Sequence, residues 1–74
     1  MNIKVIKNLS KIRAKTIFRG QEKILEGKHS AVLDKDDEEE RALYYHWLNT
    51  FGFIIDISER KDIKEKIRLG VIKK

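Results

Sequence analysis

Residues 34–57, DKDDEEERALYYHWLNTFGFIIDI, decide the fold that this sequence predicts. The carboxylates at the start of the stretch are typical of the first turn of a helix, where the helix dipole favours negative charge. Asp36 as N-cap would place Glu39 at the third helical position, which is a capping-box spacing. Apolar residues then recur every three or four positions, which predicts a helix with a core-facing stripe of Leu43, Tyr44, Trp47, Leu48 and Phe51.

The end of this stretch predicts a helix stop followed at once by a strand. Gly52 suits the left-handed position after a helix, and Phe53 would then fold back onto Leu48. Residues 53–57 are apolar at four of five positions. Such a run favours a strand covered on both faces, in the middle of a sheet or at an interface.

The first 33 residues predict an antiparallel meander. Residues 2–9 alternate in polarity except at Ile6, so this strand is expected to be covered on both faces. Residues 11–19 form a second strand, and Gly20-Gln21 suits a type II′ turn that pairs residue 19 with 22 and residue 17 with 24. After a turn at 26–28, residues 29–33 form a short strand in which either Ala31 and Leu33 or Val32 point inward.

Ser58 can cap a last helix that Gly70 would end. This helix offers only Ile63 and Ile67 on one apolar face, which is weak docking for so short a segment. We therefore divide the chain into a core domain over 1–57 and a C-terminal helix with a basic tail over 58–74, which either belongs to the same domain or serves as an interaction arm. The predicted fold class is α+β, with a small antiparallel sheet of three to four strands packed by one amphipathic helix, plus the short C-terminal helix.

Composition excludes several kinds of site. The chain has 74 residues and no cysteine, so it forms one domain at most and has neither disulfides nor thiolate metal ligands. With only His29 and His46 as imidazoles, we expect no metal and no cofactor. No apolar run approaches a membrane span, and the N-terminus lacks a signal-peptide core. We therefore expect no membrane association and a cytoplasmic location.

The net charge of +5 is divided into segments. Residues 1–30 carry eight basic and two acidic side chains, residues 31–40 carry one basic and six acidic, and residues 41–74 carry eight basic and four acidic. Such a chain can bind a polyanion, and it can equally dock onto copies of itself.

No arrangement of residues predicts catalysis. The acidic run lacks the alternating ligands and central glycine of an EF-hand loop, so capping and solvation explain it. His46 lies in the helix with no second polar group to orient it, and Ser10 and Ser58 lack a nucleophile-elbow context. We expect no enzyme activity, no catalytic residue and no small-molecule substrate.

The basic hairpin is the candidate nucleic-acid site. Period-two alternation places Lys11, Arg13, Lys15 and Arg19 on one face of the second strand. Binders of single-stranded nucleic acid place aromatic rings among such cations, yet Phe18 lies on the opposite face. The pattern therefore favours a solvated face or phosphate contact over base recognition.

Further candidates for interaction lie at the margins of residues 34–57. Tyr45 and His46 lie off the apolar stripe, so each is expected at the surface or at an interface. An uncovered edge of the strand over 53–57 would present Ile54 and Asp56 to a partner.

About 55 residues resemble a family of small phage proteins. IKVIKN, ILEGKHSAVL, DKDDEEE and FGFIIDI resemble the β-β-α-β accessory proteins encoded among head and tail genes of phages and prophages of low-GC Gram-positive bacteria. The extra strand over 11–19 and the last helix depart from that pattern. The resemblance implies an accessory structural role on a capsid, connector or tail, and it transfers no functional residue.

Three hypotheses of function follow. The first is a non-catalytic accessory structural protein of phage type, acting by contact with a protein partner or by self-association. The second is a small nucleic-acid-binding or regulatory protein that uses the basic hairpin. The third is an inhibitor of a host enzyme, in which the acidic helix start mimics nucleic acid; the positive net charge argues against it.

Overall fold

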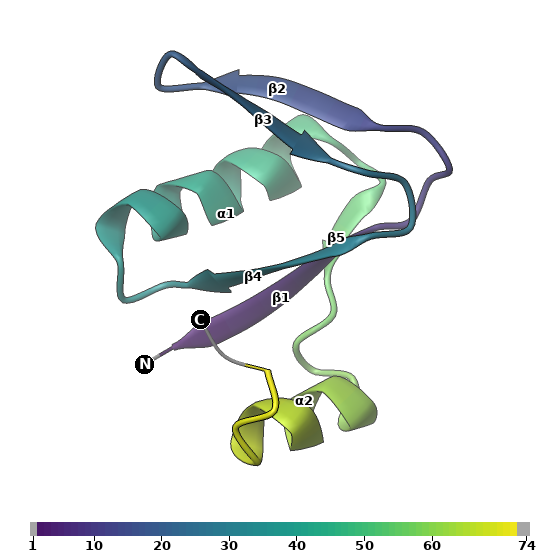
Figure 1. The fold of residues 1–74 in the computed structure, drawn as a ribbon, viewed down its shortest axis with the longest axis vertical. Coiled ribbons are helices and arrows are strands. Elements are labelled where there is room, and N and C mark those ends of the chain that lie inside the picture. The colour runs from purple at the N-terminus through teal and green to yellow at the C-terminus, as the bar shows by residue number, and fades with distance from the viewer. Residues whose placement is uncertain (1, 73–74) are drawn as a thin grey trace.

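A computed structural model describes residues 2–72, which form two helices and two antiparallel sheets (Figure 1). The elements are β1 (Ile3–Asn8), β2 (Ala14–Phe18), β3 (Gln21–Leu25), β4 (Ser30–Asp34), α1 (Glu38–Thr50), β5 (Ile54–Asp56) and α2 (Lys61–Arg68). The predicted α+β class is confirmed. The predicted meander is wrong, because β2 and β3 form a separate hairpin while β1 pairs with β4 and β5.

β1 is the middle strand of the larger sheet, whose order is β4-β1-β5. Ile6 lies opposite Ala31 on one side and Asp56 on the other. Val5 and Ile6 point to opposite faces of the sheet, and both are buried. The break in alternation at Ile6 thus marks the central strand. β5 forms an edge, so the central position expected as one alternative for residues 53–57 is wrong, and a position at an interface stays a prediction.

The hairpin turns at Arg19 and Gly20, not at Gly20-Gln21. Both turn residues have positive φ, 50° and 78°, so the turn has the φ signs of type I′ and Phe18 pairs with Gln21. The predicted pairing is therefore wrong by two residues. A shift of two leaves the residues within β2 and β3 on their predicted faces, so the division into inner and outer faces survives there. The strand begins at Ala14, and residues 11–13 precede it as an irregular segment.

One hydrophobic core joins α1 to both sheets. The core-facing stripe of α1 is confirmed, because Tyr44 and Trp47 are buried in the core and Leu43, Leu48 and Phe51 pack against it. Leu33 is also buried there with Ala31 beside it, which settles the inward side of β4. The remaining buried members come from four strands: Ile6, Ala14, Leu25 and Ile54.

Both ends of α1 differ from the prediction by small shifts. The N-cap is Asp37, whose carboxylate accepts hydrogen bonds from the backbone N–H groups of Glu39 and Glu40 at 3.0 and 3.2 Å. At the other end, Phe51 leaves the helix in an extended conformation, and its ring lies 5.5 Å from Trp47 and 5.4 Å from Phe53. The expected left-handed cap at Gly52 is therefore wrong, because packing of Phe51 directs the exit.

The segment after β5 leads to α2 on the other side of β1 from α1 (Figure 1). Ser58 does not cap this helix: α2 begins after Arg60, which makes no side-chain cap hydrogen bond. Ser58 is buried instead, because its hydroxyl accepts the Val5 N–H at 2.8 Å. The predicted end of the helix at Gly70 is confirmed by a φ of 77°.

Candidate interaction surface

The solvent-facing side of the β2–β3 hairpin, here called the outer face, is the most distinctive surface of the molecule. It consists of residues that alternate with those buried against α1, because successive side chains of a strand point to opposite faces. The inner residues Ala14 and Leu25 pair with each other and lie in the core. The outer face is formed by Arg13, Lys15, Ile17, Glu22, Ile24 and Glu26.

Ion pairs neutralise the cations of this face. The Arg13 Nε atom lies 2.7 Å from a carboxylate oxygen of Glu26, and the Lys15 Nζ atom lies 3.2 Å from Glu22. The pair of Lys15 and Glu22 joins β2 to β3, and the pair of Arg13 and Glu26 links the residue before β2 to the residue after β3. The sequence could not show them, because they depend on the register of the hairpin.

The other two predicted cations do not share the outer face. Lys11 is exposed in the segment before β2, and Arg19 occupies the turn. The Arg19 guanidinium lies 5.2 Å from the centre of the Phe18 ring and 4.0 Å from the carboxylate of Glu39 at the start of α1. The predicted row of four cations is therefore reduced to two on one face.

Two isoleucines are exposed on the outer face. Ile17 is 62% exposed and Ile24 is 43% exposed. They lie on neighbouring rungs, that is, cross-strand pairs of the hairpin, because Ile17 pairs with Glu22 and Ile24 pairs with Lys15. The Lys15–Glu22 ion pair runs diagonally between them, so the outer face interleaves apolar side chains with charges that are already paired.

His46 fastens the hairpin to α1. Its Nε2 atom lies 2.7 Å from the Thr16 hydroxyl, and its ring lies 5.2 Å from the Phe18 ring. Both contacts use the inner face of the hairpin. They assign His46 to the joint between the hairpin and the helix, and leave the outer face unobstructed.

Tyr45 projects from α1 beside Lys35. The Lys35 ammonium lies 4.9 Å from the Tyr45 ring and 5.1 Å from the Tyr44 ring, within the range of cation–π attraction. Tyr45 is exposed, as its position off the stripe predicted. It lies on a different part of α1 from the residues that contact the hairpin.

The β5 candidates have structural partners. Ile54 is buried in the core, and Asp56 accepts hydrogen bonds from the Tyr44 hydroxyl and from the Ser58 N–H, the latter at 2.7 Å. Burial raises the pKa of Asp56, but these hydrogen bonds and nearby Lys4 outweigh it, so the pKa lies below its usual value. Burial and the bond to Asp56 raise the pKa of Tyr44 well above its ordinary value.

Asn8 is a buried polar residue whose role the sequence did not reveal. Its side chain is fully buried, and its amide donates to the carbonyls of Ile12 at 2.8 Å and Leu25 at 3.0 Å. Its side-chain oxygen accepts from the N–H of Ser10 at 2.9 Å. Asn8 thereby fixes the segment that leads into β2 and the end of β3, so it holds the hairpin in place.

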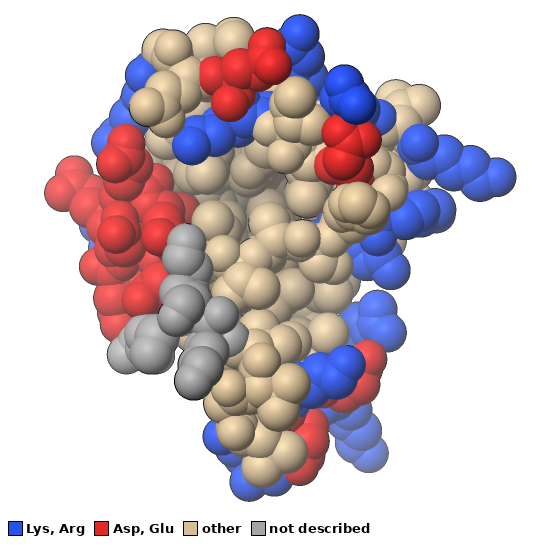
Figure 2. Space-filling view, viewed as in Figure 1, with Lys and Arg blue, Asp and Glu red and all other residues tan. Residues whose placement is uncertain are grey.

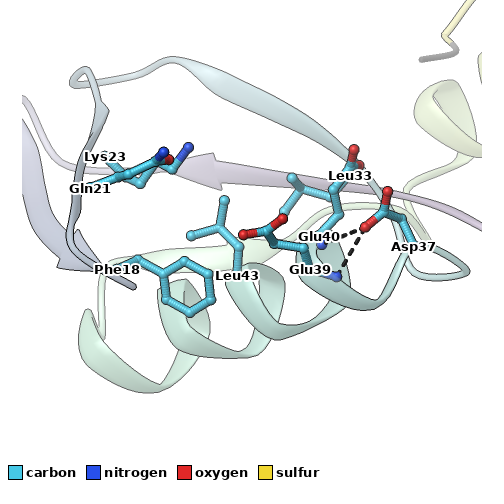
Figure 3. A pocket seen from close by; sticks show the side chains of 8 residues that line it. All are labelled: Phe18, Gln21, Lys23, Leu33, Asp37, Glu39, Glu40 and Leu43. Atoms are coloured by element: carbon cyan, nitrogen blue, oxygen red, sulfur yellow. Dashed lines mark hydrogen bonds between the residues drawn. The ribbon is translucent and has the colours of Figure 1, made fainter.

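A pocket of about 320 Å³ lies between the hairpin and the start of α1 (Figure 3). Phe18, Leu33 and Leu43 supply its apolar lining, and Lys23 lies across it from the carboxylates of the first helical turn. Two of those carboxylates already hold backbone groups: Asp37 caps the helix, and Glu40 accepts the Asp34 N–H at 2.8 Å. These two carboxylates of the pocket thus serve the helix start.

Charge is unevenly spread over the molecular surface. Figure 2 shows acidic side chains gathered where α1 begins, while Lys and Arg lie mainly toward the opposite side and the lower end. Within residues 2–72, no group of three His, Cys, Asp or Glu is placed to hold a metal ion. No helix in the same part of the chain combines the length and apolar character needed to cross a membrane.

No family model, curated protein or solved structure matches this chain.

Proposed function

We propose that this chain is a small accessory structural protein that acts through protein–protein contacts and without catalysis. The observation that carries the proposal is the outer face of the hairpin, where Ile17 and Ile24 are exposed among two ion pairs. Exposed apolar side chains among charges that are already paired favour contact with a protein over contact with a polyanion.

The same observation weighs against the hairpin as a nucleic-acid site. Phosphate binding depends on cations that release counterions from the nucleic acid. Here Arg13 and Lys15 each face a carboxylate, so the positive potential of the face is low. The only ring on β2 and β3, that of Phe18, contacts His46 on the inner face and is unavailable for base stacking there.

The resemblance to phage accessory proteins supplies the kind of assembly to test. A chain of 74 residues without staples has a small core, and burial against a larger particle would add to its stability. Capsids, connectors and tails are the assemblies that the resemblance indicates.

Two measurements test the proposal. In an anisotropy titration with single- and double-stranded DNA and RNA at two salt concentrations, we expect no tight binding that weakens steeply with salt. Steeply salt-dependent binding that Arg13→Glu with Lys15→Glu abolishes would instead establish the nucleic-acid function. In the second measurement, light scattering and co-sedimentation with purified head and tail particles should detect association. A strictly monomeric protein that also ignores those particles would refute the proposal.

A further inference from the structure

The charges of the outer face are sorted by strand. Its cations, Arg13 and Lys15, come from the β2 side, and its anions, Glu22 and Glu26, come from the β3 side. The register pairs Lys15 with Ile24 and Ile17 with Glu22, and the ion pair of Arg13 with Glu26 forms a third rung just beyond the last strand pair. The face is therefore a small grid with one basic column and one acidic column.

We propose that this face binds a second copy of the chain, face to face, about a two-fold axis parallel to the strands. The inference rests on the proposed function and names the partner of that surface. Rotation about this axis lays β2 of one copy over β3 of the other. Arg13 then faces Glu26 of the second copy while remaining beside its own Glu26, so the four charges alternate in sign around a ring.

Electrostatics selects this axis over the other two-fold arrangement. A two-fold axis across the strands would lay β2 on β2 and β3 on β3. The cations of the two copies would then meet, as would the carboxylates, and like charges brought together disfavour a complex. An isologous contact therefore has one charge-complementary solution on this face.

The size of the face sets the strength of the contact. Five residues at about 3.3 Å each and two strands about 4.8 Å apart give a face roughly 17 Å long and 10 Å wide. That is well below the roughly 800 Å² per partner of a standard stable interface, so the free dimer should be weak. Many copies held on one particle would make the same contact effective, because tethering raises the local concentration.

Charge reversal tests the contact. Sedimentation of the wild type should show dimers that accumulate toward about 1 mM, the range expected for a weak contact. Arg13→Glu with Lys15→Glu makes the face wholly acidic, and Glu22→Lys with Glu26→Lys makes it wholly basic. Each variant alone should remain monomeric, and an equal mixture should form a heterodimer. Circular dichroism of each variant confirms that it is folded.

A single cysteine tests the axis, because the chain has none of its own. The proposed axis keeps each rung opposite the same rung, so Ile17→Cys should cross-link to itself through a thiol reagent of about 8 Å reach, given packed sheets about 10 Å apart. The other axis would bring Ile17 of one copy opposite the rung of Arg13 in the second copy. The two Ile17 residues would then be four residues, or about 13 Å, apart along the strands. Asn49→Cys, exposed on α1, is the matched control and should not cross-link.

Three results would overturn the inference. The first is a wild type that stays monomeric at about 1 mM. The second is that each charge variant alone dimerises as the wild type does. The third is that cross-links form only in a mixture of Ile17→Cys with Arg13→Cys. A monomer that still binds head or tail particles would leave the proposed function standing. Steeply salt-dependent binding of nucleic acid would remove the proposed function itself.

Discussion

The helices α1 and α2 both carry apolar residues at helical spacing, yet they relate to the core in different ways. α1 has a side-chain cap at Asp37 and buries Tyr44 and Trp47 in a cluster that reaches both sheets. α2 has no side-chain cap hydrogen bond and no buried residue, although its apolar and charged positions are cleanly segregated. Ile63 and Ile67 are only half-buried.

The difference in burial between α1 and α2 shows that apolar periodicity alone does not attach a helix to a core. Large aromatic side chains bury roughly 150–250 Å² each, and α1 places two of them among core residues from all five strands, β1 to β5. α2 offers two isoleucines on two turns, and short helices gain most of their stability from packing. We therefore expect α1 to unfold with the whole molecule and α2 to open separately.

The largest expected effect comes from truncating the centre of the α1 contact. Trp47→Ala should cost about 3–5 kcal/mol, because it removes a buried aromatic side chain and leaves a cavity. A chain of this length has a total stability of roughly 4–11 kcal/mol, so the variant should lose a large part of its stability. Circular dichroism with urea denaturation measures the change.

Ile67→Ala is the matched variant in α2. It should cost about 1 kcal/mol or less, because the side chain is only half-buried. Equal losses for Trp47→Ala and Ile67→Ala would show that both helices belong to one cooperative unit.

The second effect concerns how α1 starts. Asp37→Ala removes the acceptor for the N–H groups of Glu39 and Glu40 and should cost about 1 kcal/mol. Asp37→Asn keeps an acceptor that caps about as well, so it should stay within a few tenths of a kcal/mol of wild type. If Asn and Ala were equally destabilising, charge rather than capping would account for the role of Asp37.

The features that the sequence predicted are those that depend on neighbouring residues. The stripe containing Trp47, the acidic first turn and the end of α2 at Gly70 all follow from spacing along one helix. Ile6 signalled a strand buried on both faces, and β1 is indeed the central one.

The features that were missed depend on partners distant in sequence. The chain leaves α1 at Phe51, which packs on Trp47, and not through a left-handed Gly52. The Ser58 hydroxyl accepts a hydrogen bond from the Val5 N–H and does not cap α2. The outer face was read as basic because its carboxylates belong to the other strand. The sequence fits a turn at Arg19-Gly20 as well as one at Gly20-Gln21. Only the first, which the structure has, gives the register that brings Lys15 to Glu22.

The third effect tests the bond that joins α1 to β5. Tyr44→Phe removes the hydrogen bond to Asp56 and should cost about 1 kcal/mol at neutral pH. The lowered pKa of Asp56 adds stability above its unfolded value near 4, and this stability is lost as pH falls through the folded value. The raised pKa of Tyr44 adds stability that is complete below about pH 10 and lost as pH rises further.

The stability difference between wild type and Tyr44→Phe should therefore be largest near neutrality and narrow toward both extremes of pH. Urea denaturation at pH 3, 7 and 10.5, values set on either side of the ordinary pKa values of about 4 and 10, measures it. Tyr45→Phe, at an exposed position on the same helix, is the matched control, because it removes a hydroxyl that does not contact Asp56. A constant difference for Tyr44→Phe would exclude the bond to Asp56 as its cause.

The smallest effect on global stability should come from improving α2. Arg60→Ser supplies the side-chain cap that α2 lacks, which is worth about 1 kcal/mol to a helix. If α2 opens separately, its amide hydrogens should exchange roughly fivefold more slowly, while the free energy of global unfolding changes by less than about 0.5 kcal/mol. Hydrogen exchange and urea denaturation measure the two quantities on one sample. A rise of the full 1 kcal/mol in global stability would mean that α2 unfolds together with the core. The contrast between the helices would then be one of burial and not of cooperativity.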